Sequence, residues 1–558
     1  MELKKIIEKN LLDYVGTKTH TGSSMENNNV EFFTRYFERV DYFRNNPENC
    51  GFHEIEGDHL GRKVPWGFFK GSGRDTIILI HHTDTVDTDD YGVNQELAYR
   101  PYDITEKYRE GNIDLDENVK KDLDSGKWLF GRGVSDMKGG AAIHLSLLEQ
   151  YTEDPDFKGN LLLLGLPDEE NLSAGMRGAV SLLESLKEKH DLNYILMLNV
   201  EPHERDTEQV ATIYDGSVGK LMPVVYVRGK LAHVGQVFRG FNPINLLSEI
   251  VRKTELNPDF IETVGNTTTP PPTWLYMKDK KEVYDVSLPI AAAGYMSILT
   301  LDKPPKEIFD RLHELSTQAF EEVIADVNKS YSRYQEMSGR KLEELTCKPN
   351  VKLYGDLYKE AVRDSGEAFT SAMEALMQEI KISFNKGELS IIDGAYMIIE
   401  KTLEFVNDLS PVVVLALAPP YYPNTNNKMV ADKCAEINRA VESLVDFAKK
   451  EWNQEYFVQN YFTGISDLSY AMFEADSENI DYIEENMMMW KHVYYIPLDK
   501  IKKLSVPVLN IGPWGRDLHK YTERVYIEDL FERTPVLIDR TIKQLLGQRI
   551  SGIAVAVY

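Results

Sequence analysis

The first two hundred residues alternate short apolar runs with stretches that show helical spacing of hydrophobic and polar positions. Each apolar run has the length of a buried strand, and the stretches between them are long enough to form helices. This alternation is typical of an α/β layer built on a mainly parallel sheet. The expected strands are 76–80, 161–166 and 194–200, and the expected helices are 139–151 and 173–189.

The pattern changes near residue 217 and returns near residue 409. A strand at 223–227 and a helix at 242–253 are followed by charged, amphipathic helical sequence that continues to about 409. Apolar strands at 411–417 and 506–511 then resume the first pattern. We therefore expect a mixed, mainly parallel sheet flanked by helices, interrupted by an inserted α+β domain with a helical extension. The predicted domains are 1–216 with 409–558, and the insert 217–408.

Composition and charge exclude several classes of protein. A chain of 558 residues is too long for one ordinary core. Its net charge of -26 argues against a nucleic-acid or membrane-surface partner. No apolar run approaches the ~20 residues of a membrane helix, and the start lacks the apolar region of a secretory signal. Three isolated cysteines form no disulfide framework. We expect a cytoplasmic protein.

Ionisable side chains follow three of the predicted strands at the points where those strands end. His82 and Asp84 follow the first strand, Glu169 and Glu170 the second, and Glu201 the third. In an open α/β sheet, functional residues gather at the carboxyl ends of the strands. Two neighbouring glutamates beside a buried strand would repel each other and lose hydration. A cation, most simply a metal ion, is therefore expected at this edge.

Two further residues join this set. Asp136 is the only carboxylate of a glycine-rich loop over 131–140, and His519 follows the strand at 506–511. Together these residues offer the nitrogen and oxygen ligands that zinc accepts. Alone, each is ambiguous: Asp136 could cap the next helix, and a lone histidine is more often an ordinary one.

The spacing of His82 and Asp84 predicts a contact between their side chains. Residues two apart in extended chain share a face. We therefore expect the Asp84 carboxylate to accept a hydrogen bond from the His82 ring nitrogen that does not bind metal, as carboxylates do for many ligating histidines. His81 points the other way and is expected to be structural.

These motifs, in this order, resemble those of the co-catalytic dizinc aminoacylase and carboxypeptidase family, which includes acetylornithine deacetylase and succinyl-diaminopimelate desuccinylase. The matching segments are 82–84, 131–140, 168–170 with Gly175, Glu201-Pro202, and His519 with Glu523. The resemblance implies two zinc ions, with cobalt or manganese as alternatives. It implies that His82 and Glu201 bind one ion, that Glu170 and His519 bind the other, and that Asp136 bridges them. Glu169 would be the general base, and Asp84 would support His82.

The inserted domain resembles the lid or dimerisation domain of that family through residues 229–235 and 240–242. The matching histidine, His233, would reach the active site, commonly that of the other subunit of a homodimer, and would help to bind the substrate carbonyl. A surface histidine at a turn is the alternative. The strand expected at 291–301 lacks the arginine that many relatives use to hold a substrate carboxylate. Residues 464–467 resemble a family loop near the active site, and a plain turn explains them equally well.

The resemblance implies hydrolysis of an amide bond in an N-acyl amino acid or a short peptide. Residues 273–276 with Asp279, and 418–423, resemble a branch of the family linked to bacterial arginine utilisation, which suggests an arginine- or ornithine-related substrate. A dipeptidase or carboxypeptidase with the same metal site is an alternative. A non-catalytic binding protein that keeps the fold is another, although such a protein would have no need of Glu169.

Overall fold

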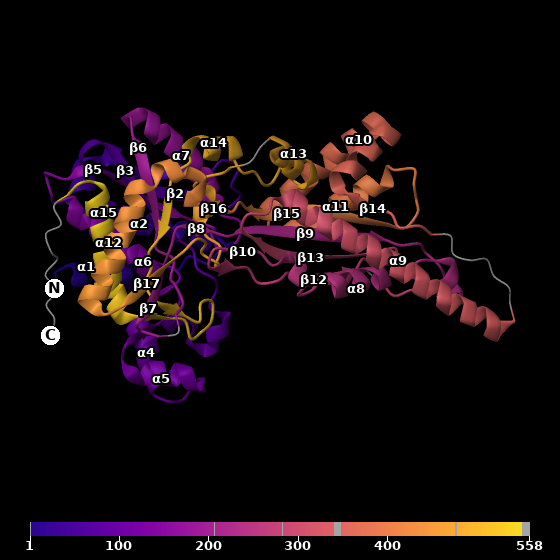
Figure 1. The fold of residues 1–558 in the computed structure, drawn as a ribbon, viewed down its shortest axis with the longest axis horizontal. Coiled ribbons are helices and arrows are strands. Elements are labelled where there is room, and N and C mark those ends of the chain that lie inside the picture. Colours follow the sequence, from indigo (N-terminus) through magenta and orange to yellow (C-terminus); the bar gives the residue numbers. More distant parts are fainter. Residues whose placement is uncertain (1, 206, 282, 340–346, 475–476, 549–558) are drawn as a thin grey trace. The chain divides into compact units, whose positions relative to one another are not determined.

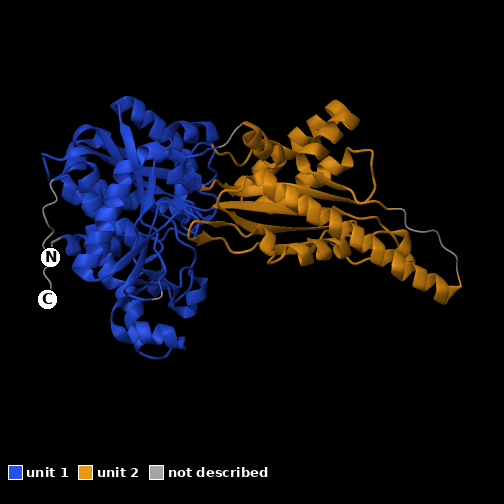
Figure 2. Ribbon diagram, viewed as in Figure 1, with its two compact units in different colours: residues 1–218, 425–474, 497–558 blue, residues 219–424, 475–496 orange. Residues whose placement is uncertain are grey.

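The computed structural model describes residues 2–205, 207–281, 283–339, 347–474 and 477–548. The chain forms two compact units, coloured separately in Figure 2. Unit 1 comprises Met1–Val218, Thr425–Glu474 and Pro497–Tyr558, and unit 2 comprises Gly219–Asn424 and Ala475–Ile496. Among the described residues, none of the helices combines the length and the apolar character that crossing a bilayer requires.

Unit 1 is built on an eight-stranded mixed sheet, which confirms the predicted fold class (Figure 1). Its centre is parallel, because β3 pairs in parallel with both β5 and β6, and β6 pairs in parallel with β18. The β1–β2, β2–β5 and β18–β7 pairs are antiparallel. In spatial order the strands are β1 (Cys50–Glu54), β2 (Lys63–Lys70), β5 (Lys158–Leu166), β3 (Ser72–His82), β6 (Asn193–Asn199), β18 (Val508–Asn510), β7 (Val210–Tyr214) and β17 (Glu455–Gln459).

Both faces of this sheet are buried, which explains why its central strands are continuously apolar. Ile77 and Leu79 belong to a core shared with helices, while Ile78 and Ile80, which point to the opposite face, are also fully buried. Helix α6 (Lys138–Tyr151) packs against α1 (Glu2–Val15), and α12 (Ala435–Trp452) packs against α15 (Thr534–Leu545). Helix α7 (Ala174–His190) packs against β5. The predicted strands and helices of the first two hundred residues are confirmed.

A small second sheet of unit 1 joins two distant segments of the chain. It has the order β19 (Gly515–Arg516), β20 (Arg524–Tyr526) and β4 (Trp128–Phe130), all antiparallel. The pairing sets Arg524 opposite Phe130, and the main-chain N–H of Gly131 donates to the carbonyl of Glu523 at 3.1 Å. The glycine-rich loop that carries Asp136 therefore starts beside the segment that carries His519.

Unit 2 contains a five-stranded sheet of order β12 (Thr273–Asp279), β13 (Ala291–Thr300), β9 (Gly219–Arg228), β15 (Val412–Tyr422) and β14 (Val351–Leu353). Its main helices are α8 (Pro243–Thr254), α9 (Pro305–Ser338), α10 (Tyr354–Asn385), α11 (Ile391–Glu404) and α13 (Ser477–Asn486). The long helical extension expected before residue 409 is present as α9, α10 and α11.

The predicted domain boundary at 409 is wrong, whereas the one at 216/217 lies two residues from the observed division. Strand β15 pairs antiparallel with β9, with Val414 opposite Tyr226, so it completes the sheet of unit 2. Unit 1 resumes only at Thr425, and the chain returns to unit 2 over Ala475–Ile496. A buried apolar strand has the same sequence pattern in either sheet, so the pattern at 411–417 could not assign it.

Candidate active site

Three adjacent strands of unit 1 deliver the candidate ligands to one edge of the sheet. β5, β3 and β6 lie side by side and run in the same direction, with His82 opposite Leu166 and Leu79 opposite Leu198. His82 is the last residue of β3, while Glu169 and Glu201 come just after β5 and β6. The parallel order of the strands therefore brings together residues that are far apart in sequence.

Asp136 lies between the two candidate histidines. Its Oδ1 is 2.9 Å from Nε2 of His82, and its Oδ2 is 3.2 Å from Nε2 of His519. Nε2 of His519 also lies 3.0 Å from Oε1 of Glu170, and Nε2 of His82 lies 3.8 Å from Oε1 of Glu201. A carboxylate that presents one oxygen to each of two histidines has the arrangement of a bridging ligand.

The donor set fits metal ions. Ligand atoms of His82, Asp136 and Glu170 all lie within 4.8 Å of one another, and so do those of His82, Glu169 and Glu201. These are imidazole nitrogens and carboxylate oxygens, which suit zinc and other divalent transition metals. The structure thus brings together six of the residues expected at this site; the division of ligands between two ions stays a prediction.

Asp84 supports the site differently from the way we expected. Nδ1 of His82 lies 3.0 Å from the main-chain oxygen of Asp84, while the nearer Asp84 carboxylate oxygen is 3.7 Å away, too far for a hydrogen bond. The carboxylate instead accepts from the main-chain N–H groups of Glu169 (3.1 Å) and Glu170 (3.3 Å), and from the hydroxyl of Thr21. Asp84 therefore orients His82 with its carbonyl and the two glutamates with its side chain.

The electrostatics of the cluster match a site that is built for cations. Burial raises the pKa of Glu169, and the charges of Glu201, Glu170 and Asp467 raise it further against the opposing effect of His82. Burial also raises the pKa of Glu201 and of Glu170. These carboxylates crowd one another without enough positive charge to balance them, which a bound metal ion would supply.

The pKa values of the two histidines are also raised, but by the neighbouring carboxylates and against the effect of burial. The hydrogen bonds that the His519 ring donates to the carboxylates of Asp136 and Glu170 raise the pKa of His519 to about 10. Burial lowers the pKa of His82, but the charge of Glu201 and the hydrogen bond with Asp136 outweigh it, so the net shift is upward. In the metal-free protein, protons on the histidines would take the place of metal ions, since both bind the same nitrogen atoms.

A buried ion pair fixes the loop of Asp136. Arg132 donates to Oε2 of Glu523 at 2.9 Å, and Oε1 of Glu523 accepts the main-chain N–H groups of Ser135 (3.1 Å) and Asp136 (3.2 Å). Arg132 also donates to the main-chain oxygen of His519 at 3.3 Å. His519 has a φ of 65°, in the left-handed region that non-glycine residues rarely adopt, so this contact helps to hold an unfavourable backbone conformation.

Two glycines allow the backbone to pack tightly behind Glu201. A Cβ at Gly512 would lie 2.0 Å from the main-chain oxygen of Glu201, and one at Gly140 would lie 2.4 Å from that of Val200. Both distances are far below contact distance, so only glycine fits. Gly140 is the last residue of the motif 131–140. It contributes to the site by letting the backbone pack closely against Val200.

Two features near the site could not be assigned from the sequence: the role of residues 464–467 and the role of Arg62. Asp467 is 3% exposed, and its negative charge raises the pKa of both Glu169 and Glu201, so this residue of the loop 464–467 lies close enough to act on the cluster. Arg62 forms an ion pair with Asp168 at 2.5 Å. Nothing in the local sequence marked Arg62 as a partner of Asp168, because the two residues lie far apart in the chain.

The remaining candidates are His81 and His233. His81 is fully buried between the rings of Tyr14 and Phe33, as expected for a structural residue. His233 lies in unit 2 at the start of the turn η4 (Val234–Arg239), is exposed, and its Nδ1 accepts the main-chain N–H of Gly235 at 3.1 Å. A role for His233 in binding substrate stays a prediction.

Comparison with known families decides the class of protein. The model of Peptidase family M20/M25/M40 matches residues 78–540, which span all five candidate metal ligands. The chain belongs to peptidase family M20/M25/M40. It is thus a metal-dependent hydrolase of the peptidase and amidohydrolase type, as the motifs implied.

Relatives within the M20 family extend over nearly the whole chain. The uncharacterized protein YqjN of Bacillus subtilis (strain 168) is 33% identical over 542 residues, covering 96% of each protein. Protein RocB of the same organism is 29% identical over 539 residues, covering 95% of this chain and 93% of RocB. Among solved structures, the M20 family metallo-carboxypeptidase Sso-CP2 from Sulfolobus solfataricus aligns with a TM-score of 0.53 at 11% identity, covering 97% of this chain and 99% of Sso-CP2. That likeness shows a shared fold.

Proposed function

We propose that this M20 family member uses two divalent metal ions, zinc in the first place, to hydrolyse the amide bond of an N-acyl amino acid or short peptide. The observation that carries the proposal is Asp136, whose two carboxylate oxygens face His82 and His519 separately, with Glu169 in the same cluster. In this assignment His82 and Glu201 bind one ion, Glu170 and His519 bind the other, and Asp136 bridges them.

The protein's own residues divide the chemistry between binding and proton transfer. Bound metal ions would lower the pKa of a water molecule toward ~7 and polarise the amide carbonyl. Glu169 would accept the proton of the attacking water and return it to the leaving amine. The main-chain N–H groups of Glu169 and Glu170 both donate to the Asp84 carboxylate. These two hydrogen bonds would fix the backbone so that the two side chains serve different roles.

Two further assignments complete the proposal. His233 would donate a hydrogen bond to the substrate carbonyl as negative charge develops on its oxygen. Whether it does so within its own subunit or across a homodimer formed through unit 2 is decided by the oligomeric state. The proposed location of the protein is the cytoplasm, where a small amide or peptide would be its only partner apart from a second copy.

The similarity to Protein RocB over 539 residues supports an arginine- or ornithine-related substrate. A net charge of -26 is compatible with a cationic substrate. The strand β13 contains no arginine, so a substrate carboxylate would need a different partner from the one that many relatives use. A dipeptide or carboxypeptidase substrate would use the same metal cluster and the same base.

The test combines metal analysis of the purified protein with a mass-spectrometric screen of N-acylated amino acids, including arginine and ornithine derivatives, and dipeptides. The proposal predicts two divalent ions per chain and release of a free amino acid, which Glu169→Gln abolishes. Bound metal without hydrolysis of any compound would instead favour a binding protein. Hydrolysis that survives Glu169→Gln would assign the chemistry to another residue.

A further inference from the structure

Arg62 lies in a buried group of ion pairs to which the proposed hydrolysis assigns no role. Its side chain is 4% exposed. Nη1 lies 2.5 Å from Oδ1 of Asp168 and 2.9 Å from Oε1 of Glu26, and Nη2 lies 2.6 Å from Oδ1 of Asp58. Burial lowers the pKa of Arg62, but these three carboxyl groups raise it by more, so the guanidinium stays charged. Because a buried charge is costly unless it is paired, the three contacts hold this side chain in one place.

Asp58 fixes the orientation of the guanidinium plane. Nε and Nη2 of Arg62 both donate to Oδ1 of Asp58, at 3.1 and 2.6 Å, and the main-chain N–H of Arg62 donates to Oδ2 at 2.8 Å. A planar fork of donors held in this way has a defined direction. Nη1, on the remaining side of the fork, is left for Asp168 and Glu26.

The pairing of β2 with β5 explains why Arg62 meets Asp168. The two strands are antiparallel with Trp66 opposite Leu164, so each step back along β2 corresponds to one step forward along β5. Four more steps in this register set Arg62 against Asp168, just beyond the ends of the two strands. The ion pair therefore joins the segment before β2 to the turn that carries the proposed base.

Asp168 has a backbone conformation that non-glycine residues rarely adopt. Its φ is 70°, in the left-handed region, and such a conformation persists only where the surroundings hold it. Oδ1 contacts Arg62 and accepts from the side-chain amide of Asn171 at 3.2 Å, while Oδ2 accepts the main-chain N–H of Ala174 at 3.1 Å. The main-chain oxygen accepts the N–H of Ser173 at 2.6 Å. Arg62 supplies the charged contact in this set.

The conformation of Asp168 decides how the chain continues into Glu169 and Glu170. Their main-chain N–H groups donate to the carboxylate of Asp84, at 3.1 and 3.3 Å. The turn is thus held at Asp168 by its side chain and at the next two residues by their N–H groups. With metal bound, Glu170 would also be held by its ion, whereas the place of Glu169 would depend on the turn alone.

We propose that Arg62 is a positioning residue: its ion pair with Asp168 fixes the turn that directs the Glu169 carboxylate into the metal cluster. The inference rests on the function proposed above, because it requires Glu169 to transfer a proton. Arg62 acts through Asp168 and does not itself take part in the chemistry.

The experiment compares Arg62→Lys with Arg35→Lys in the metal-loaded, full-length protein. Lysine keeps the charge and loses the planar fork. Arg35 forms an exposed ion pair with Glu31 and is the matched control. Since a misplacement of ~1 Å can cost ~100-fold, we expect kcat of Arg62→Lys to fall by about 10- to 100-fold on a substrate found in the screen. KM should change by less than about threefold, the pattern of a contribution made in the transition state. Metal content should match that of the parent chain.

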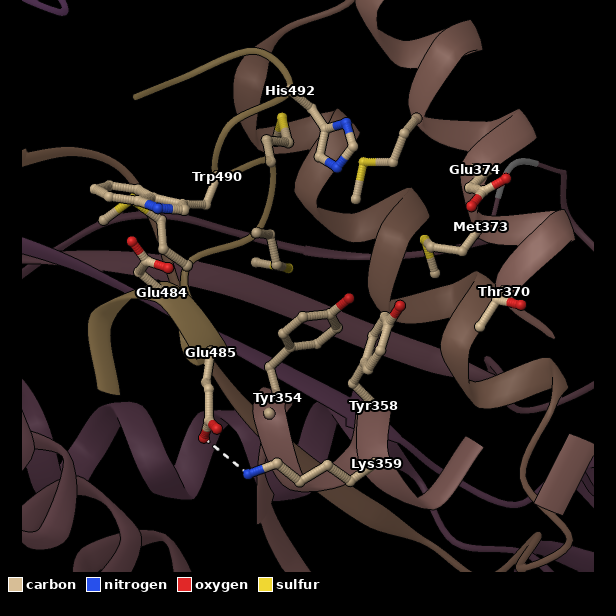
Figure 3. Close-up of a pocket in the computed structure, with 15 residues that line it drawn as sticks. Tyr354, Tyr358, Lys359, Thr370, Met373, Glu374, Glu484, Glu485, Trp490 and His492 are labelled. Carbon is tan, nitrogen blue, oxygen red and sulfur yellow. Dashed lines mark hydrogen bonds and ion pairs between the residues drawn. The ribbon is translucent and has the colours of Figure 1, made fainter. Parts of the chain in front are cut away.

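A second variant breaks the same ion pair from the other side. Asp168→Asn should lower kcat as Arg62→Lys does, and it carries the test if Arg62→Lys does not fold. The double variant should lose no more than about twofold beyond the worse single variant, because both substitutions remove one interaction. Glu485→Gln is the matched control, since it removes the ion pair with Lys359 in the lining of a cavity of unit 2 (Figure 3) and should leave kcat unchanged.

Hydrogen exchange followed by mass spectrometry tests the positioning without a substrate. In Arg62→Lys, exchange of the peptide 167–175, which contains the N–H groups bonded to Asp84, should speed up by at least about tenfold. A peptide over β6, residues 193–199, should exchange as in the parent chain.

Parental kcat, or parental exchange over 167–175, in Arg62→Lys would overturn the proposal. Faster exchange to the same degree in both peptides would also overturn it, because Arg62 would then serve general stability. Additive losses in the double variant would show that the two residues do not act as a pair. Parental turnover in Glu169→Gln would instead refute the proposed function, and the exchange measurement, which needs no turnover, separates that failure from this one.

Discussion

The side chain of Glu523 binds Arg132 with one carboxylate oxygen, at 2.9 Å, and the main-chain N–H of Asp136 with the other. Since Arg132 also donates to the main-chain oxygen of His519, one buried ion pair connects the proposed bridging ligand with a second ligand. The two ligands lie 383 residues apart in sequence, and β4 and β20 bring their segments together. The proposed metal site therefore depends on groups that would touch neither metal nor substrate.

Arg132→Lys should weaken metal binding without removing any ligand. The guanidinium donates to four acceptors, in Asp87, Asp90, His519 and Glu523, and one ammonium group cannot reproduce that geometry. We expect metal affinity to fall by about 10- to 100-fold, as for other residues that orient ligands. Competition with a chromophoric chelator measures it.

The control for this prediction is Arg74→Lys. Arg74 forms an exposed ion pair with Asp191, and such pairs contribute little. Its metal affinity should equal that of the parent chain. Parental metal affinity in a folded Arg132→Lys variant would show that the ion pair does not position the ligands.

His519→Ala should lower the metal content of the chain. The substitution removes an imidazole that contacts both Asp136 and Glu170, so the remaining carboxylates would hold their ion weakly. Elemental analysis after dialysis, with His492→Ala as an exposed control in unit 2, measures the loss. Full occupancy of two ions in His519→Ala would remove this residue from the metal site.

Glu26→Gln should make stability less dependent on pH. Burial, with the charges of Asp84 and Asp168, raises the pKa of Glu26 to about 9 against the opposing effect of Arg62, and Oε2 of Glu26 has no hydrogen-bond partner among the described residues. The folded chain thus holds a proton that the unfolded chain releases. The resulting stabilisation is complete below pH ~4.5 and is lost as the pH rises through about 9.

Glutamine cannot ionise, so the variant escapes this loss. We expect the Tm of Glu26→Gln, relative to the parent chain, to rise by on the order of a few °C between pH 6 and pH 9. Glu56→Gln, at an exposed position, is the control and should show no such trend. A relative Tm that falls over this interval would show that Glu26 is ionised and acts as the partner of Arg62.

The sequence predicted the sheet of unit 1 and the grouping of candidate side chains at its edge because both depend on local patterns. β3, β5 and β6 are apolar runs, and His82, Glu169 and Glu201 follow them directly. Once the strands are parallel neighbours, their carboxyl ends lie together. The positions of these three side chains therefore follow from strand order and need no knowledge of side-chain packing.

The features that sequence reasoning missed depend on contacts between distant segments. The assignment of β15 to unit 2 depends on its pairing with β9, which an apolar pattern does not encode. Likewise, the contact of Asp84 with the main chain of Glu169 depends on a rotamer and a loop conformation. Arg62 and its partner Asp168 lie over one hundred residues apart, so only the folded chain identifies them as a pair.

The central claim is that neighbouring glutamates have different tasks: Glu170 binds metal and Glu169 transfers a proton. The most direct test measures metal content and turnover of Glu169→Gln and Glu170→Gln side by side, on a substrate found in the screen. The account predicts that Glu169→Gln keeps both ions and loses roughly two to four orders of magnitude in turnover, the usual span for lost acid–base catalysis. It predicts that Glu170→Gln loses metal. Equal metal loss in both variants, or parental turnover in Glu169→Gln, would contradict the division.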